Sequence, residues 1–448
     1  MLAVEKGKSC AFLTDVTQFR NENMTNSLAS PLNLPCGVSI PNKLGKSAMT
    51  EGLADANDNP TEALIKLYRT WSDGGSGLLM TGNVMIDRRY LERAGNVVLE
   101  DDQAMPMLRR WAAEGTHGGN QLWMQLSHPG RQCPRMVNSQ PLAPSEVQLK
   151  LLANFSKPRV MTEADIEDVI QRFTRSASLA KQAGFTGIQI HCAHGYLISQ
   201  FLSPLINHRD DQWGGSLENR ARLARRIIRS VREAVGPGFP VSAKLNSADF
   251  QKGGFSFDDC ITVAGWLAED GLDLLEISGG TYEQASMFDL DTAEVRESTR
   301  KREAYFIEYA ANIRESAKIP LMITGGFRSR AVMENAVNSG EVDLIGLARP
   351  LCTQPDAPKQ LINQSIDAVD CYENGLVMGR GFWGNNSSSS MVKSINAFGQ
   401  LGFYYWQIIR LSNGLAIEPR LGVLKAFSRH MLNDFQLNRR RKKLPASN

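Results

Sequence analysis

The stretch from residue 187 to residue 220 reads GIQIHCAHGYLISQFLSPLINHRDDQWGGSLENR, and the rest of the chain can be arranged around it. It opens with a short apolar run, GIQI, that favours a β-strand and follows a helix expected to stop at Gly184. We therefore predict a buried strand that ends at His191. A short strand preceded by a helix suggests one unit of an α/β protein.

The same alternation of short apolar strands and amphipathic helices recurs from about residue 46 to about residue 366. We predict eight strands, at 46–49, 77–84, 121–126, 187–191, 240–245, 272–277, 320–324 and 342–347. Eight such units predict a (β/α)8 TIM barrel. A doubly wound sheet is the alternative, but no G-x-G-x-x-G follows the first strand and the chain has no P-loop.

Local signals refine this arrangement. Residues 32–40 alternate around a Pro-Cys-Gly turn, which predicts a hairpin. Asn59 and Pro60 favour a helix start at 60–71, Thr162 and Asp165 favour a capping box for 162–182, and Ser216 is a predicted N-cap. We expect residues 1–30 to be a poorly ordered leader, residues 31–367 to form the barrel, and residues 368–448 to form an extension.

The candidate chemistry lies directly after the strand at 187–191. His191 and His194 are three residues apart where the backbone leaves the sheet, and Tyr196 follows. Two neutral imidazoles can each donate an N–H to an oxygen that gains negative charge, and a phenol can deliver a proton. This set suits a substrate carbonyl or nitro oxygen with protonation of a neighbouring carbon, although an H-x-x-H pair is also compatible with a metal site.

A second candidate site follows the last two predicted strands. Gly325 and Gly326 follow the seventh strand and leave backbone N–H groups available to bind an anion. Arg349 follows the eighth strand and can neutralise that anion. Together they predict a phosphate site, which marks a phosphorylated ligand without identifying it.

The segment HCAHGYLISQFLSPLINHRDDQWGGSLENR resembles the active-site segment of the old yellow enzyme family of FMN-dependent NADH:flavin oxidoreductases. The resemblance implies tightly bound, non-covalent FMN, with Thr50 tuning its potential, Gly82 against the ring and Gln125 at the pyrimidine edge. Lys244 would lie beside the flavin N1–O2 region, where many relatives have arginine. The implied cofactor-binding residues are Ala48, Met49, Thr50, Gly82, Gln125, Lys244, Gly325, Gly326, Ala348 and Arg349.

The resemblance implies that the hairpin at 32–40 caps the bottom of the barrel. It also implies an activity. Hydride would pass from NAD(P)H through the flavin to the β carbon of an electron-poor alkene, with His191 and His194 holding the activating oxygen and Tyr196 protonating the α carbon. An NADH oxidase, an oxidative demethylase or a desaturase/isomerase of the same fold is an alternative, as is a barrel that only binds a phosphorylated ligand. A metal-dependent hydrolase using His191, His194 and His128 ranks lower, because strand-end carboxylate partners are missing.

Composition limits the classes of partner and the cellular location that we expect for the protein. The 448 residues carry 50 basic and 47 acidic side chains, a net charge of +3, which gives no nucleic-acid signature. Seven cysteines occur without a C-x-x-C pair, so we expect reduced thiols in a cytoplasmic protein, with no metal cluster.

The aromatic stretch 402–410 is too short for a membrane span, so we predict a helix that packs on the barrel. The basic run 439–443 is expected to be a solvated tail, and a homo-oligomer is compatible with the sequence.

Overall fold

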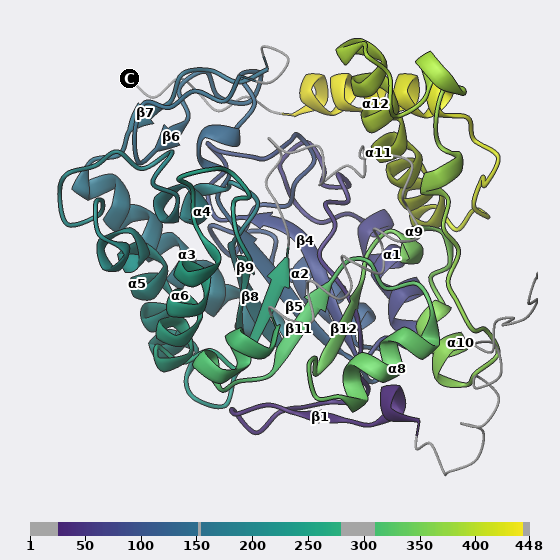
Figure 1. Ribbon diagram of the computed structural model, residues 1–448, viewed down its shortest axis with the longest axis horizontal. Coiled ribbons are helices and arrows are strands. Elements are labelled where there is room, and N and C mark those ends of the chain that lie inside the picture. Colours follow the sequence, from purple (N-terminus) through teal and green to yellow (C-terminus); the bar gives the residue numbers. More distant parts are fainter. Residues whose placement is uncertain (1–25, 151–153, 279–309, 442–448) are drawn as a thin grey trace, which may run out of the picture.

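The computed structural model describes residues 26–150, 154–278 and 310–441. Its central feature is a closed barrel of parallel strands (Figure 1). Eight strands form it, in the order β10-β11-β12-β3-β4-β5-β8-β9. The strands are β3 (Leu44–Lys46), β4 (Leu78–Met85), β5 (Gln121–Ser127), β8 (Gly187–Cys192), β9 (Val241–Asn246), β10 (Leu274–Ser278), β11 (Leu321–Thr324) and β12 (Leu344–Leu347). The predicted TIM barrel is confirmed.

The first strand lies earlier in the sequence than predicted. It ends at Lys46, although the backbone N–H of Ser47 still donates to the Leu347 carbonyl at 2.8 Å. Ala48 and Met49, whose apolar character suggested a strand, lie instead on the wall of a cavity at the end of the barrel. Apolar side chains that line a cavity produce the same sequence signal as a strand that packs on both faces.

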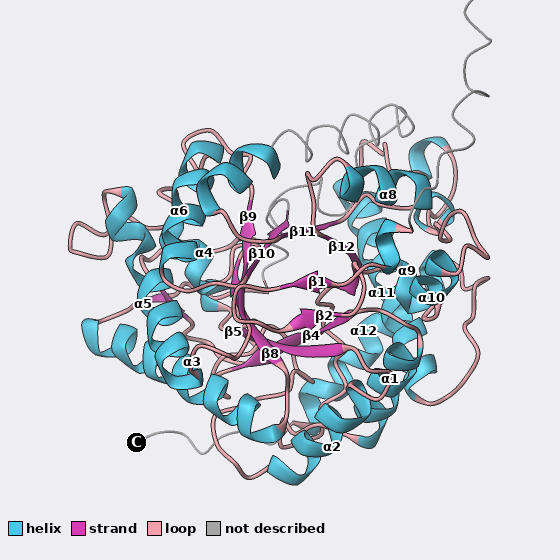
Figure 2. Ribbon diagram, turned by 90° about the horizontal axis from the view of Figure 1, so that it is seen from below, coloured by secondary structure: helices cyan, strands magenta, loops and turns pink. Residues whose placement is uncertain are grey.

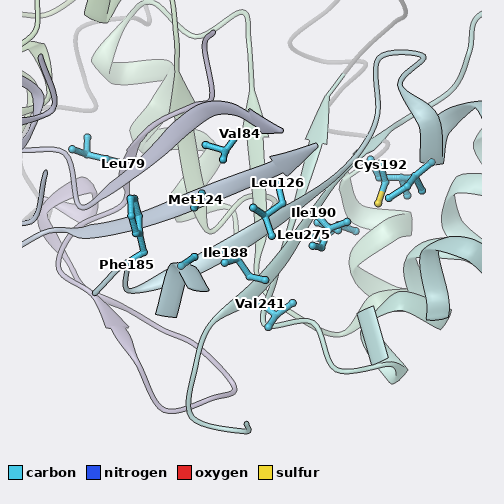
Figure 3. Packing of buried hydrophobic residues seen from close by; sticks show 14 of the residues in the cluster. Leu79, Val84, Met124, Leu126, Phe185, Ile188, Ile190, Cys192, Val241 and Leu275 are labelled. Carbon is cyan, nitrogen blue, oxygen red and sulfur yellow. The ribbon is translucent and has the colours of Figure 1, made fainter. Parts of the chain in front are cut away.

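Alternation along each strand separates the core from the barrel interior. In β8, Ile188, Ile190 and Cys192 belong to the hydrophobic layer between strands and helices (Figure 3). The intervening Gln189 and His191 therefore face the inside, because successive side chains of a strand point to opposite faces. Gly187 also faces inward, and a Cβ there would lie 2.6 Å from the indole of Trp123, so only glycine leaves room for that ring.

An N-terminal hairpin closes one end of the barrel. Strands β1 (Leu32–Asn33) and β2 (Ser39–Ile40) pair antiparallel, as predicted. Leu32, Leu34 and Ile40 pack on residues at the amino ends of the barrel strands, including Leu78 and Leu274. Figure 2 shows β1 and β2 across that end of the barrel. The amino end is therefore apolar and plugged, which leaves the carboxyl end for a site.

Helices surround the barrel (Figure 2). They are α1 (Glu62–Asp73), α2 (Met105–Gly115), α3 (Glu163–Ala183), α4 (Leu197–Leu202), α5 (Leu217–Val235), α6 (Phe257–Glu269), α8 (Arg330–Asn338), α9 (Pro350–Thr353) and α10 (Ala357–Ile362). A small outer pair of strands, β6 (Leu142–Ala143) and β7 (Arg159–Val160), lies beside them. The capping box of Thr162 and Asp165 and the N-cap of Ser216 are confirmed.

The start of α1 was predicted wrongly. Thr61 is the N-cap, accepting from the backbone N–H of Leu64 at 3.3 Å. Asn59 is instead part of a preceding turn, in which its backbone N–H donates to the Asp55 carboxylate at 2.9 Å. The aspartate side chain, four residues earlier, competes for the backbone that would have begun the helix.

The C-terminal extension contains α11 (Ser390–Ser412) and α12 (Val423–Arg440), which pack on each other beside α1 and α9 (Figure 1). The predicted helix at 402–410 is therefore confirmed as part of α11. Gly399 and Gly402 allow close crossing, since a Cβ would lie 2.2 Å from the Val423 side chain and 2.5 Å from the Ala426 carbonyl oxygen, respectively.

Two ion pairs fasten α12 to the barrel. Asp434 pairs with Arg93, and Arg441 binds both carboxylate oxygens of Asp58, with Nε lying 2.8 and 3.1 Å from them. No helix in the three described ranges is long and apolar enough to cross a membrane. Most of the predicted leader, residues 1–25, and the end of the basic run, residues 442–443, lie outside the described residues.

Candidate active site

A cavity of about 270 Å³ lies at the carboxyl end of the barrel strands. All the predicted site residues line it except Gly82, Gly325 and Gly326. The sequence analysis did not predict the remaining lining residues, which are Asn83, Cys352, Ala397, Gln400, Leu401, Tyr404, Tyr405 and Ile408. The last six of these belong to α11.

The three predicted catalytic rings converge at the end of β8. The ring centroid of His191 lies 5.1 Å from that of His194 and 4.8 Å from that of Tyr196. The turn that brings them together is left-handed, with φ of 61° at His194 and 74° at Gly195. A non-glycine residue in this region costs about 1 kcal/mol or more, and the Asn246 side chain helps to hold the turn by accepting from the His194 N–H at 3.1 Å.

Both histidines are held in the neutral state. Burial lowers the pKa of His191 well below its usual value, with His194 and Lys244 adding to the effect. Burial followed by the charge of Lys244 lowers the pKa of His194 to about 3. Each ring therefore carries one N–H at neutral pH.

Backbone and side-chain contacts indicate where those protons lie. His191 Nδ1 accepts from the backbone N–H of Ala193 at 3.2 Å, which assigns its proton to Nε2. His194 Nε2 lies 2.8 Å from the hydroxyl of Ser278. If that hydroxyl donates, the proton of His194 is on Nδ1.

Asn83 positions the hydroxyl of Tyr196. Its side-chain N–H donates to the phenolic oxygen at 3.3 Å. An amide N–H can only donate, so the oxygen accepts here and its own hydrogen can be donated to another group. Asn83 lies on β4 beside an irregularity in its pairing with β5. The polar residues in LLMTGNV, inside an otherwise apolar strand, were a signal that could have identified it.

A layer of polar side chains crosses the barrel beneath the cavity. Gln125 donates to Gln189 at 2.7 Å, and Gln189 donates to Glu276 at 2.8 Å. Glu276 is fully buried and also pairs with Lys244 at 2.9 Å. The predicted cation therefore faces the cavity with a buried carboxylate as its counter-ion. The glutamate within the apolar run LDLLEIS was the sequence signal for this partner.

Thr50 and Gly82 occupy different surroundings. Thr50 lines the cavity and donates to Glu92 at 2.9 Å. Gly82 does not line it, so the expectation that a ring lies against Gly82 receives no support. A Cβ at Gly82 would lie 2.4 Å from both the Met49 carbonyl oxygen and the Glu51 carboxylate, so glycine is required there for close packing of the chain.

The predicted phosphate cradle is only partly assembled. Arg349 lines the cavity and its Nε lies 3.2 Å from Glu373, which Arg328 also contacts at 2.8 Å. Burial opposes ionisation of Glu373, but Arg349 and Arg328 outweigh it and lower the pKa of Glu373 to about 2. Gly325 and Gly326, with φ of 109° and 81°, form an exposed left-handed turn outside the cavity wall.

His128 does not join the other two histidines. Its ring packs against that of Tyr90, with centroids 5.0 Å apart and planes tilted by 39°, and its Nδ1 accepts from the Gly130 N–H at 3.1 Å. Among the residues with described positions, no group of three or more His, Cys, Asp or Glu side chains is arranged to hold a metal ion.

Comparison with known proteins assigns the family. The profile of the NADH:flavin oxidoreductase / NADH oxidase family matches residues 27–367. The chain belongs to this family. The old yellow enzyme resemblance is thereby confirmed, and the family is one of NAD(P)H-dependent flavin enzymes.

Individual relatives agree with the assignment. The NADH-dependent flavin oxidoreductase iccE of Talaromyces variabilis is 37% identical over 356 residues, covering 75% of this chain and 86% of that protein. The NADH-dependent flavin oxidoreductase iliE of a Neonectria species is 36% identical over 357 residues, covering 74% of this chain. The chain spans only about half, 46%, of the Neonectria protein.

A solved structure is also similar. The complex of 2-naphthoyl-CoA reductase with 2-naphthoyl-CoA superposes with a TM-score of 0.71 and 26% identity, covering 77% of this chain and 54% of that one.

The cavity offers groups that suit FMN, the cofactor that the old yellow enzyme resemblance implies. Gln125 and Lys244 present an amide and an ammonium group to it, which match the acceptor oxygens of a flavin pyrimidine edge. The buried Oδ1 of Asn83 has no hydrogen-bond partner among the described residues and can accept from a ligand. Arg349 supplies a guanidinium for a phosphate. The residues present therefore fit the cofactor.

Proposed function

We propose that the protein reduces electron-poor alkenes, such as enones and enals, with NAD(P)H and tightly bound, non-covalent FMN. The observation that carries the proposal is the convergence of His191, His194 and Tyr196 on a cavity that Gln125 and Lys244 also line. Bound FMN would accept hydride from NAD(P)H and pass it to the β carbon of the alkene.

The chain's own residues supply the remaining chemistry. His191, with its proton on Nε2, and His194 donate to the activating oxygen, and these donors stabilise the negative charge that grows there as hydride arrives. Because both rings are neutral, they stabilise this charge by hydrogen bonding without transferring a proton.

Tyr196 delivers the proton to the α carbon. The amide of Asn83 donates to its oxygen and stabilises the phenolate that forms when the proton leaves. The hydride and this proton together complete the reduction of the double bond, and the phenolate then recovers a proton from solvent.

Lys244 and Arg349 would hold the cofactor. The ammonium group of Lys244 would stabilise the negative charge of a reduced flavin, although its ion pair with Glu276 neutralises part of that effect. Arg349 would bind the phosphate at the rim of the cavity.

The six cysteines within the described ranges are free thiols, which supports the expected cytoplasmic location.

Isotope labelling of the product tests the proposal directly. The holoenzyme is supplied with an enone and deuterated NADH in water, and then with unlabelled NADH in D2O. We expect deuterium at the β carbon in the first experiment and at the α carbon in the second. A protein that consumes NADH and oxygen but leaves every activated alkene unchanged would refute alkene reduction and favour the oxidase alternative.

A further inference from the structure

One side of the cavity comes from the C-terminal extension rather than from the barrel. Ala397, Leu401, Tyr404 and Ile408 line the cavity and recur along α11 with the spacing of one helical face. All four lie beyond residue 367, where the match to the family ends. The part of the site contributed by α11 is therefore not explained by the chemistry that the family shares.

The character of this wall is hydrophobic. Ala397, Leu401 and Ile408 present only apolar side chains, and Tyr404 adds an aromatic ring. The polar groups of the wall have partners within the protein. Gln400 donates its amide N–H to the Leu376 carbonyl at 3.2 Å, and the hydroxyls of Tyr404 and Tyr405 bond to Glu373 and Arg93, respectively. The wall offers a ligand apolar contact and little hydrogen bonding.

The wall is also held in a fixed position. On the neighbouring Tyr405, the ring of His430 from α12 stacks with centroids 5.1 Å apart and planes 6° apart. The guanidinium of Arg93, from the loop after β4, lies 4.1 Å from the Tyr405 ring centroid and pairs with Asp434 of α12. Since these contacts join both helices to the barrel, α11 presents a preformed surface to the cavity.

We propose that Leu401, Tyr404 and Ile408 of α11 form a subsite for the hydrophobic body of the substrate. The subsite selects activated alkenes that carry a further aromatic or alicyclic ring, attached to the reacting enone, over enones that lack one. This inference rests on the proposed function, in which the histidine pair holds the activating oxygen at the barrel side of the cavity. The rest of the substrate then extends towards α11.

Binding to the oxidised holoenzyme tests the subsite without turnover. Dissociation constants are measured for 2-cyclohexen-1-one and for 4-phenyl-3-buten-2-one, which carries a phenyl ring, in wild type and Leu401→Ala. We expect the larger enone to bind about tenfold more weakly in the variant, because apolar contact is lost, while the smaller enone changes less than twofold.

Leu424→Ala is the matched control. Leu424 has the same side chain in the same helical pair, but it is 56% exposed on α12 and away from the cavity wall. We expect this variant to bind both enones as wild type does. Ile408→Val removes a single methylene from the wall and serves as a second, milder test if Leu401→Ala does not retain its flavin.

Each result has a definite meaning. Unchanged preference for the larger enone in both Leu401→Ala and Ile408→Val, or an equal loss for the two enones, overturns the subsite. If wild type prefers the larger enone and the variants reduce that preference, but NADH reduces neither compound, the subsite stands and the proposed reaction fails.

Discussion

The two sides of the cavity differ in origin and in chemistry. The barrel side presents His191, His194 and Lys244 at strand ends inside the region that matches the family. The other side presents the apolar face of α11, which lies outside that region. The difference teaches that chemistry and selectivity can occupy separate segments of one chain, so that a change in the extension can alter the choice of substrate while the catalytic geometry is kept.

The largest expected effect concerns the barrel side. His191→Ala should slow reoxidation of the reduced flavin by an enone by about 10²-fold, the loss of one oxyanion donor, while flavin reduction by NADH changes much less. Stopped-flow measurement of the two half-reactions checks this. His128→Gln, which alters a buried histidine outside the cavity, should leave both rates near wild type. Equal slowing of both half-reactions in His191→Ala would contradict the oxyanion role.

A second prediction tests whether Arg349 binds a phosphate. Arg349→Ala should weaken FMN roughly 10- to 100-fold, because a charge-assisted hydrogen bond is lost, and should change riboflavin binding little. Fluorescence titration of the apoprotein with each flavin provides the measurement. Arg330→Ala is the control, since Arg330 pairs with Glu334 and Asp367 on the outside of α8. An equal loss for FMN and riboflavin would rule out phosphate recognition by Arg349.

The buried pair of Lys244 and Glu276 gives a third, smaller effect. Glu276→Gln should raise the flavin reduction potential, since it removes a negative charge, and Lys244→Met should lower it. A shift of roughly 30 mV corresponds to about 1.4 kcal/mol for a two-electron couple. Potentials are measured against redox dyes. The double variant should lie closer to wild type than Lys244→Met does, and a potential that is the same in all variants would place the pair away from the flavin.

The smallest effect concerns His430 of the extension. Burial, followed by the charge of Arg93, lowers the pKa of His430 to about 4, below the value near 6.5 of an unfolded histidine. The unfolded state therefore binds the proton more readily, so stability is full above pH 6.5 and is lost as the pH falls towards 4. His430→Phe keeps a ring against Tyr405, and it should flatten this dependence by up to about 1.4 kcal/mol per pH unit.

Urea unfolding at pH 7, 6 and 5 measures this dependence. His117→Phe is the matched control, because His117 is half exposed and pairs with Asp73 on the surface. If His430→Phe and wild type lose stability in parallel between pH 7 and pH 5, the neutral state assigned to His430 is wrong.

Much of the barrel side could be predicted from the sequence because its signals are local. The short apolar run GIQI predicts a buried strand that ends at His191, and the repeated strand–helix units predict the barrel. Sequence alone does not separate the possible roles of Gly82, because a glycine needed for close packing on Met49 and Glu51 leaves the same signal as one that faces a ligand.

The α11 side could not be predicted in the same way. The residues of α11 indicate an amphipathic helix that covers something apolar, but not which surface it covers. The contacts that fix the extension on the barrel, such as that of Arg93 with Asp434 of α12, join residues 341 positions apart in the sequence. Contacts at such separations follow from the assembled fold and leave no local pattern to interpret.

That separation has a consequence for biosynthesis. All eight barrel strands precede residue 348, whereas α11 begins at Ser390 and the ion pair of Arg441 with Asp58 joins residues 383 positions apart. At translation rates of 5–20 residues per second, the stretch 390–440 takes roughly 3 to 10 s to synthesise. During that interval the barrel can close while its carboxyl end is still uncovered. A flavin then has an open route into the cavity before α11 and α12 dock.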